Sequence, residues 1–107
     1  MQTPLQVTFR HLDHSPALET LIRERAETLD SLYERLIGCR VVVEAQHRPN
    51  HAASSFRIRI DMQIPGHDII VTREPPAETV AEDPHAAVRE AFDAARRRLE
   101  ETIRRYA

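Results

Sequence analysis

Arginine is the residue type in this sequence with the clearest capacity for chemistry. The 107-residue chain contains fifteen arginines and no lysine. A guanidinium group is planar and stays charged, so it can pair bidentately with a phosphate group. The alternative is that an all-arginine composition reflects genomic base composition rather than function. Six of the arginines fall within residues 83–106: Arg89, Arg96, Arg97, Arg98, Arg104 and Arg105.

Residues 83–106 have the pattern of one long amphipathic helix. Asp83 is a suitable N-cap, and Pro84 suits the first helical position. Apolar side chains then recur at steps of three and four, which predicts one buried face: Val88, Phe92, Ala95, Leu99, Ile103 and Tyr106. On a helical wheel of about 100° per residue, the arginines lie on the flanks and on the polar face. Four acidic residues are interspersed among them: Glu90, Asp93, Glu100 and Glu101.

The arginines of this helix are candidates for contact with nucleic-acid phosphates. They are densest in the last turns, where acidic residues are few: Arg97, Arg98, Arg104 and Arg105. The alternative is a solvated helix face on which arginines and acids pair with one another. Further arginines could extend a basic patch across the predicted sheet: Arg40, Arg57 and Arg59.

Signatures of enzymes are missing from the sequence. Two glycines are too few for a glycine-rich phosphate loop, and no G-x-S-x-G nucleophile elbow is present. Cys39 stands at the start of a predicted strand, where we expect it to be packed rather than nucleophilic. We therefore expect no catalytic residue, no bound metal and no cofactor.

Six histidines are predicted to lie in turns or at helix starts: His11, His14, His47, His51, His67 and His85. Solvated histidines are the simplest interpretation. A second interpretation is a pH-sensitive or RNA-contacting role, because imidazolium forms near neutral pH and can meet phosphate. A metal-dependent or hydrolytic enzyme that uses the histidines is a third, although the sequence has no H-E-x-x-H pattern.

The composition is that of a folded protein with one core. At 107 residues and 41% apolar content, we expect a single domain over residues 1–107. The net charge of −2 argues against a generally basic, adhesive protein. A single cysteine excludes an internal disulfide and suggests reducing cytoplasm. No signal peptide or membrane-spanning run is expected.

The rest of the chain reads as four strands and a first helix. Alternating apolar residues predict a strand over residues 5–10, and Ser15 and Pro16 then predict a helix start. The helical pattern includes Leu32 and continues to Leu36, with Gly38 at the C′ position. Strands are predicted over residues 39–45, 56–64 and 68–73. A loop is expected at 46–54, a tight turn at 65–68 and a connection at 74–82.

The predicted order is β-α-β-β-β-α, an α+β fold in which two helices pack on one face of a four-stranded sheet. The result is a sandwich like that of a double-stranded-RNA-binding domain. Strands two to four should form an antiparallel meander, and strand one should run parallel to strand two. The other face of the sheet is expected to be polar, with these residues: Gln6, Thr8, Arg10, Arg40, Val42, Glu44, Arg57, Arg59 and Asp61.

In this order and in three of its stretches, the chain resembles the short ribosome hibernation-promoting factors, also called ribosome-associated inhibitors or sigma-54 modulation proteins. The resemblance covers nearly the whole chain and rests on the element order and on three stretches: LQVTFRHLDHSPAL, ERLIGCRVVVE and EDPHAAVREAFDAARRRLEETIRR. The last is the most specific, because its acidic start and Ala-Ala-apolar step precede an arginine-rich helix. The chain departs from the family in its net charge and in the four acids of that helix.

The resemblance implies a cytoplasmic protein that binds the small ribosomal subunit and its rRNA in the mRNA/tRNA channel and silences translation under stress or in stationary phase. It implies no catalysis, cofactor, small-molecule substrate or membrane. The implied rRNA-binding residues are those of both helices: Arg89, Arg96, Arg97, Arg98, Arg104, Arg105, Arg23 and Arg25. The alternative is a divergent member that acts as a protein-interaction or dimerisation module without tight rRNA binding, in which the same fold could pair as a homodimer.

Overall fold

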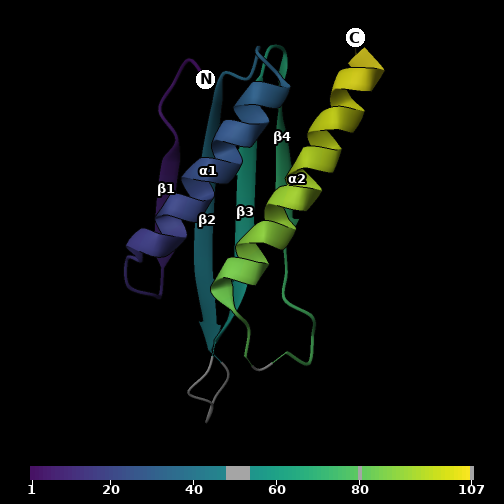
Figure 1. The fold of residues 1–107 in the computed structure, drawn as a ribbon. Helices are drawn as coiled ribbons and strands as arrows, with labels where there is room; N and C mark the ends of the chain where they lie inside the picture. The colour runs from purple at the N-terminus through teal and green to yellow at the C-terminus, as the bar shows by residue number, and fades with distance from the viewer. Residues whose placement is uncertain (48–53, 80, 107) are drawn as a thin grey trace.

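A four-stranded sheet with two helices on one face makes up the part of the chain that the structure describes (Figure 1). The computed structural model describes residues 1–47, 54–79 and 81–106. In chain order the elements are β1 (Gln6–Arg10), α1 (Pro16–Leu32), β2 (Gly38–His47), β3 (Ser54–Ile64), β4 (His67–Arg73) and α2 (Pro84–Tyr106). The predicted α+β order and the placement of both helices on one face are confirmed.

The strands lie in the order β1-β2-β3-β4. β1 runs parallel to β2, and β2, β3 and β4 form an antiparallel meander. In the register, Val41 pairs with Val7 on one side and with Ile60 on the other, so apolar residues line up across the sheet. A crossover through α1 connects the two parallel strands, as a parallel pair requires.

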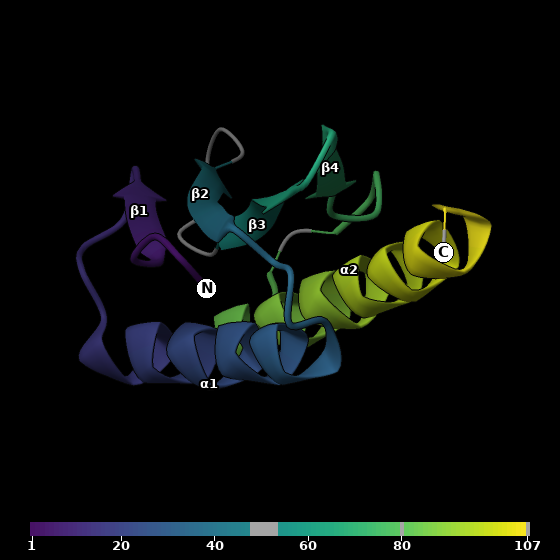
Figure 2. The ribbon, with the colours of Figure 1, turned by 90° about the horizontal axis from the view of Figure 1, so that it is seen from above.

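The core lies between the inner face of the sheet and the two helices (Figure 2). Ile58, Ile60 and Met62 of β3 are fully buried beneath the helices. α1 contributes Ile22, and α2 contributes Val88 and other members of its apolar stripe. No helix of the described residues covers the outer face of the sheet (Figure 2). Arg40, Arg57 and Arg59 are exposed on this face, whereas Asp61 of β3 is buried although it lies on the same face.

Both helix starts follow the predicted capping chemistry. Ser15 Oγ accepts a hydrogen bond from the Leu18 N–H at 3.2 Å. Asp83 Oδ1 accepts one from the His85 N–H at 3.0 Å. A proline follows each cap, where its missing N–H group would have had no helical partner.

The predicted end of α1 is wrong. The helix ends at Leu32, and Tyr33 is extended with its N–H donated to the Leu29 carbonyl oxygen. Leu32, expected on the buried face, is 38% exposed. Gly38 does not close the helix but begins β2, where a Cβ atom would lie 2.8 Å from Gln63 Oε1 and closer still to Thr3 Oγ1. Close approach of neighbouring atoms, rather than a helix cap, explains this glycine.

β2 and β3 are longer than predicted, because the strands reach His47 and Ser54. The predicted loop therefore shrinks from both ends, and residues 48–53 lie outside the described part of the chain. The turn between β3 and β4 consists of Pro65 and Gly66, with Gly66 at a φ of 93° that favours glycine.

Candidate nucleic-acid interface

All six arginines of α2 are exposed. They are exposed because the helix buries its opposite side, where Val88, Phe92 and Leu99 pack in the core. Ile103 is partly buried against the same core; the side chain of Tyr106 is outside the described set. The arginines lie off the apolar stripe, as the pattern predicted, and are free to contact a partner without disturbing the core.

Two of these arginines are held by acids of the same helix. Arg96 Nε donates to Glu100 Oε1 at 2.7 Å, and Arg105 pairs with Glu101 at 3.6 Å. Both are exposed (i, i+4) pairs, worth only about 0.3–0.5 kcal/mol. Such a pair can open and give its guanidinium to a phosphate.

The other arginines of the helix have no acidic partner among the described residues. Within the described residues, four form no ion pair: Arg89, Arg97, Arg98 and Arg104. Glu90 is not among their partners, because its carboxylate reaches back to Arg73 at 3.1 Å. The helix therefore carries two kinds of arginine: those paired with its own acids, and those without an acidic partner among the described residues.

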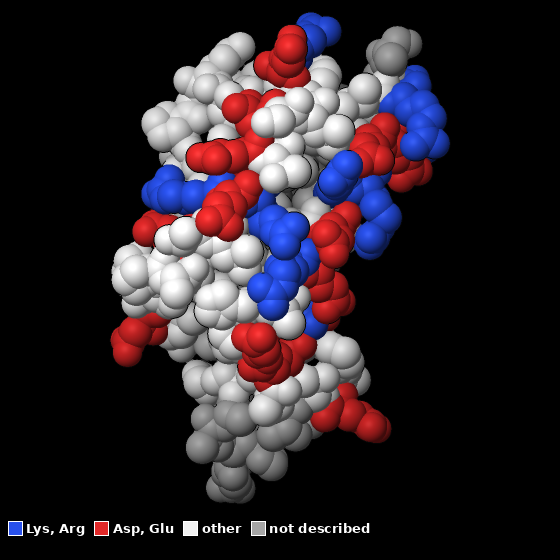
Figure 3. Space-filling view, in the orientation of Figure 1, with Lys and Arg blue, Asp and Glu red and all other residues white. Residues whose placement is uncertain are grey.

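The helical face as a whole carries both charges (Figure 3). Blue basic groups and red acidic groups alternate over α1 and α2 in this view, rather than forming one large basic area. Phosphate binding here would depend on a few placed guanidinium groups more than on a strong general field.

α1 contributes two further candidate arginines, which differ in their exposure and in their neighbours. Arg23 is exposed and pairs with Glu19 at 3.4 Å. Arg25 is half-buried and lines a shallow groove between the helices together with Phe92, Asp93 and Arg96. The structure therefore brings Arg25 of α1 and Arg96 of α2 to one groove, which the sequence could not indicate.

The sheet arginines lie on the other side of the molecule. Arg40, Arg57 and Arg59 are exposed on the outer face of β2 and β3, away from the helices. Arg40 Nε donates to Gln6 Oε1 at 3.2 Å, and Arg57 Nε donates to Glu74 Oε1 at 2.6 Å. The sheet separates them from the helix arginines, so the two sets form two surfaces and not one continuous patch.

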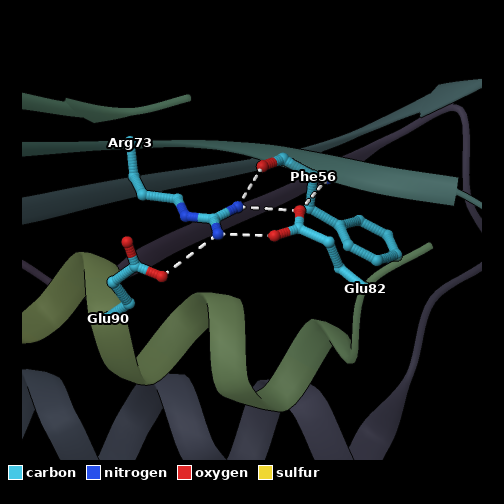
Figure 4. Close-up of polar contacts among 4 residues, drawn as sticks. All are labelled: Phe56, Arg73, Glu82 and Glu90. Atoms are coloured by element: carbon cyan, nitrogen blue, oxygen red, sulfur yellow. Dashed lines mark hydrogen bonds and ion pairs between the residues drawn. The ribbon is translucent and has the colours of Figure 1, made fainter. Parts of the chain in front are cut away.

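Arg73 is a charged residue of a different kind, with a side chain only 8% exposed (Figure 4). Its Nη1 donates to the Phe56 carbonyl oxygen and to Glu82 Oε1, each at 2.8 Å. Its Nη2 donates to Glu82 Oε2 at 2.5 Å and to Glu90 Oε2 at 3.1 Å. The cluster joins the end of β4 to β3, to the connection before α2 and to α2 itself.

The electrostatics of the cluster follow from these bonds. Hydrogen bonding from Arg73 lowers the pKa of Glu82, helped by the Phe56 N–H and opposed by burial. Hydrogen bonding to Glu82 in turn raises the pKa of Arg73. Sequence reasoning gave Arg73 no role, yet a signal was present: strand alternation after Ile69 and Val71 points Arg73 inward, and an inward arginine needs an acid.

Within the ranges that the structure describes, the remaining reactive side chains do not gather into a site. Cys39 is buried, and burial, with the nearby charge of Asp61, raises its pKa to about 12, so it stays a protonated thiol. Among the residues that the structure describes, no three His, Cys, Asp or Glu side chains are placed to share a metal ion. None of the described helices is long and apolar enough to cross a membrane.

The histidines are more varied than predicted. His11 and His14 lie in the turn before α1, where His14 Nε2 is 3.2 Å from Glu19 Oε2, and His85 lies in the first turn of α2. His47 and His67 are strand residues, at the end of β2 and the start of β4, so their placement in turns is corrected. The prediction for His51 lies outside the described residues.

Comparisons with known proteins bear on this geometry. The family model described as "Sigma 54 modulation protein / S30EA ribosomal protein" matches residues 5–106. A comparison with curated protein sequences gives no match. Among solved structures, a ribosomal subunit interface protein from Coxiella burnetii is similar, with a TM-score of 0.70, 16% identity and coverage of 92% of this chain and 94% of that chain. The Protein Y N-terminal domain of Thermus thermophilus has a TM-score of 0.67 and 19% identity, covering 91% and 94% respectively.

Proposed function

Because the chain belongs to the Sigma 54 modulation protein / S30EA ribosomal protein family, we propose that it binds the small ribosomal subunit and represses translation. The protein acts without catalysis, in the cytoplasm, by occupying the channel used by mRNA and tRNA under stress or in stationary phase. The contacts are made to rRNA phosphates by arginines of α2 and α1.

The observation that carries this proposal is the set of arginines on α2 that have no acidic partner in the described part of the chain. Arg97 and Arg104 are seven residues apart, so they stand on the same line of the helix, about 10 Å apart along its axis. Arg98 lies beside Arg97, and all three are exposed and without an acidic partner among the described residues. Such a row suits a phosphate backbone, because each guanidinium can take one phosphate without first breaking an ion pair.

Arg89 is likewise exposed and without an acidic partner among the described residues, but the other candidates would have to give up an existing contact or a half-buried position. Arg96, Arg105 and Arg23 must exchange a carboxylate for a phosphate, which weakens their net contribution. Arg25 is half-buried in the groove between the helices and can reach only a group that enters it. We therefore expect the four arginines without a described acidic partner to account for most of the phosphate binding: Arg89, Arg97, Arg98 and Arg104.

Co-sedimentation of the purified protein with small ribosomal subunits, across a series of salt concentrations, tests the proposal. Each phosphate contact that is lost reduces the slope of log affinity against log salt by about 1. We expect this reduction for R97E and for R104E, and a loss of binding when both are combined. R35E is the matched control: it makes the same charge change at an exposed arginine between α1 and β2.

Two results would count against the proposal. One is a folded wild-type protein that does not sediment with small subunits even at low salt. The other is an equal loss of binding in R35E, which would indicate a response to net charge rather than contact by α2.

The alternative function is a protein-interaction or dimerisation module without tight rRNA binding. The net charge of −2 and the mixed charges of the helical face favour it. Affinity purification that recovers one protein partner but no rRNA, together with failed co-sedimentation, would select this alternative.

A further inference from the structure

The outer face of the sheet contains a hollow that the proposed ribosome contact does not use. Its volume is about 230 Å³, and β1, β2 and β3 each contribute to its lining. Four arginines border it: Arg10, Arg40, Arg57 and Arg59. Its size is below the roughly 300–1,000 Å³ of pockets for drug-sized ligands, so it can enclose one ring system while the rest of a larger ligand lies along its rim.

Asp61 is the unusual residue of this hollow. It belongs to β3, lines the hollow and is only 9% exposed. Its Oδ1 atom is buried and has no hydrogen-bond partner among the described residues. A buried acceptor without a donor is costly, at about 1–3 kcal/mol or more for a charged group, so Asp61 Oδ1 is a place where a ligand N–H group would be stabilised.

The arginines around Asp61 do not supply that donor. Arg40 is the cross-strand partner of Asp61 in the register, but its Nε donates to Gln6 instead. Arg57 is held by Glu74 at 2.6 Å. Arg10 and Arg59 form no ion pair with any described residue, so two guanidinium groups at this hollow are available to an anion.

A ligand that complements the hollow therefore has two features: N–H donors for Asp61 and an anionic group for the arginines. A simple anion satisfies only the second and would be repelled by the carboxylates of Asp61 and Glu44, which also lines the hollow. A nucleotide has both features. Guanine in particular presents two adjacent donors, N1–H and the 2-amino group, and arginine planes can stack on a base.

We propose that the outer-face hollow binds a guanine nucleotide, with Asp61 accepting from the base and Arg59 and Arg10 contacting the phosphate. Val42, half-buried between these groups, gives the base an apolar contact. The same chemistry is offered by a free guanine nucleotide and by a guanine in single-stranded RNA. The site lies on the face opposite the helices, so it does not rest on the proposed ribosome contact.

Titration of the isotope-labelled protein, followed by amide NMR shifts, tests the site. GMP is expected to move the amides of β1, β2 and β3 around Val42 and Arg59, and to leave those of α2 in place. IMP, which lacks the 2-amino group, is the matched ligand and should bind several-fold more weakly. A pentanucleotide RNA with one central guanine, compared with its all-uracil counterpart, distinguishes the two sources: tighter binding than GMP identifies RNA, and weaker binding identifies the free nucleotide.

Two variants complete the test. D61N keeps the size of the side chain but replaces the carboxylate, and should weaken GMP binding by about tenfold or more. R59Q changes an exposed side chain, so it keeps the assay informative should D61N not fold, and should also weaken binding. The proposal is overturned if neither GMP nor the guanine-containing RNA shifts the outer-face amides, if IMP binds as well as GMP, or if a folded D61N binds GMP unchanged.

Discussion

Arg73 shows how the position of a single charged residue decides its role. Most arginines of the chain are exposed and can exchange partners, whereas Arg73 is enclosed by Glu82, Glu90 and the Phe56 carbonyl oxygen. Removing one partner of a buried ion pair leaves an uncompensated charge and costs more than the pair itself contributes. The same residue type therefore serves packing in one place and contact with partners in another.

We expect E82Q to lower the free energy of unfolding by about 3 kcal/mol, because Arg73 would lose its bidentate, buried carboxylate. E90Q is the matched control: it removes a second carboxylate from the same guanidinium, but that side chain is 65% exposed. Its cost should stay below about 1 kcal/mol. Urea denaturation of the three proteins gives both values, and equal costs for E82Q and E90Q would contradict this account of the cluster.

The ion pair between Arg73 and Glu82 also predicts that the stability of the wild-type protein and that of E82Q depend differently on pH in acid. The pKa of Glu82 in the folded protein is lowered below the 4.5 of an unperturbed glutamate, so between these two pKa values the unfolded chain binds more protons. The stabilisation by this carboxylate is thus fully present above about pH 4.5 and is lost as pH falls through the lowered pKa. The free energy of unfolding of the wild-type protein should therefore fall more steeply below pH 4.5 than that of E82Q. If the two proteins give parallel curves of unfolding free energy against pH, Glu82 does not have a lowered pKa in the folded protein.

At the scale of elements, the sequence pattern was sufficient to predict the buried face of a helix or strand where one periodicity runs through it without interruption. The alternation of β3 and the stripe of α2 each predicted the buried face, and the outward arginines followed from that. The end of α1 could not be predicted this way. The apolar spacing continues past Leu32 to Leu36, but Leu36 is buried in the connection that leads into β2 rather than in the helix.

Contacts between residues that are distant in sequence also could not be predicted from the sequence pattern. Gly38 fitted a helix cap, yet its small size is required by Thr3 and Gln63, which are distant in sequence. The inward position of Arg73 could be read from strand alternation, but its partner Glu82 lies in a connection without periodicity. The hollow at Asp61 likewise depends on which residues of three strands come into register.

The strand start at Gly38 can be tested directly. We expect G38A to lower the free energy of unfolding by about 1–3 kcal/mol, because the added Cβ atom overlaps Thr3 Oγ1 and lies 2.8 Å from Gln63 Oε1. T3A removes the nearer of these atoms, so G38A should cost less in a T3A background. Urea denaturation of the single and double variants measures this coupling; strictly additive effects would mean that the glycine is not required by Thr3.

At the scale of the whole molecule, the sheet divides the surface into two faces with different arginines. Among the described residues, the helical face bears the guanidinium groups of α2 that have no acidic partner, and the outer face bears those of Arg10 and Arg59 near Asp61. Since net charge is −2, neither face attracts RNA through a strong overall field. Orientation on a ribosomal subunit would then be set by which face presents guanidinium groups in the right places.

This orientation predicts which face small subunits protect from a thiol reagent. D93C places a thiol on α2 beside Arg96, and D68C makes the same charge change on the outer face of β4. The native Cys39 should not react with the thiol reagent, because it is buried and its pKa is raised to about 12. With small subunits in excess, maleimide labelling of D93C should slow several-fold while that of D68C is little changed, since phosphate contacts by α2 cover only the helical face. Protection of D68C alone would place the ribosome contact on the sheet, and the arginines of α2 would then be a solvated surface.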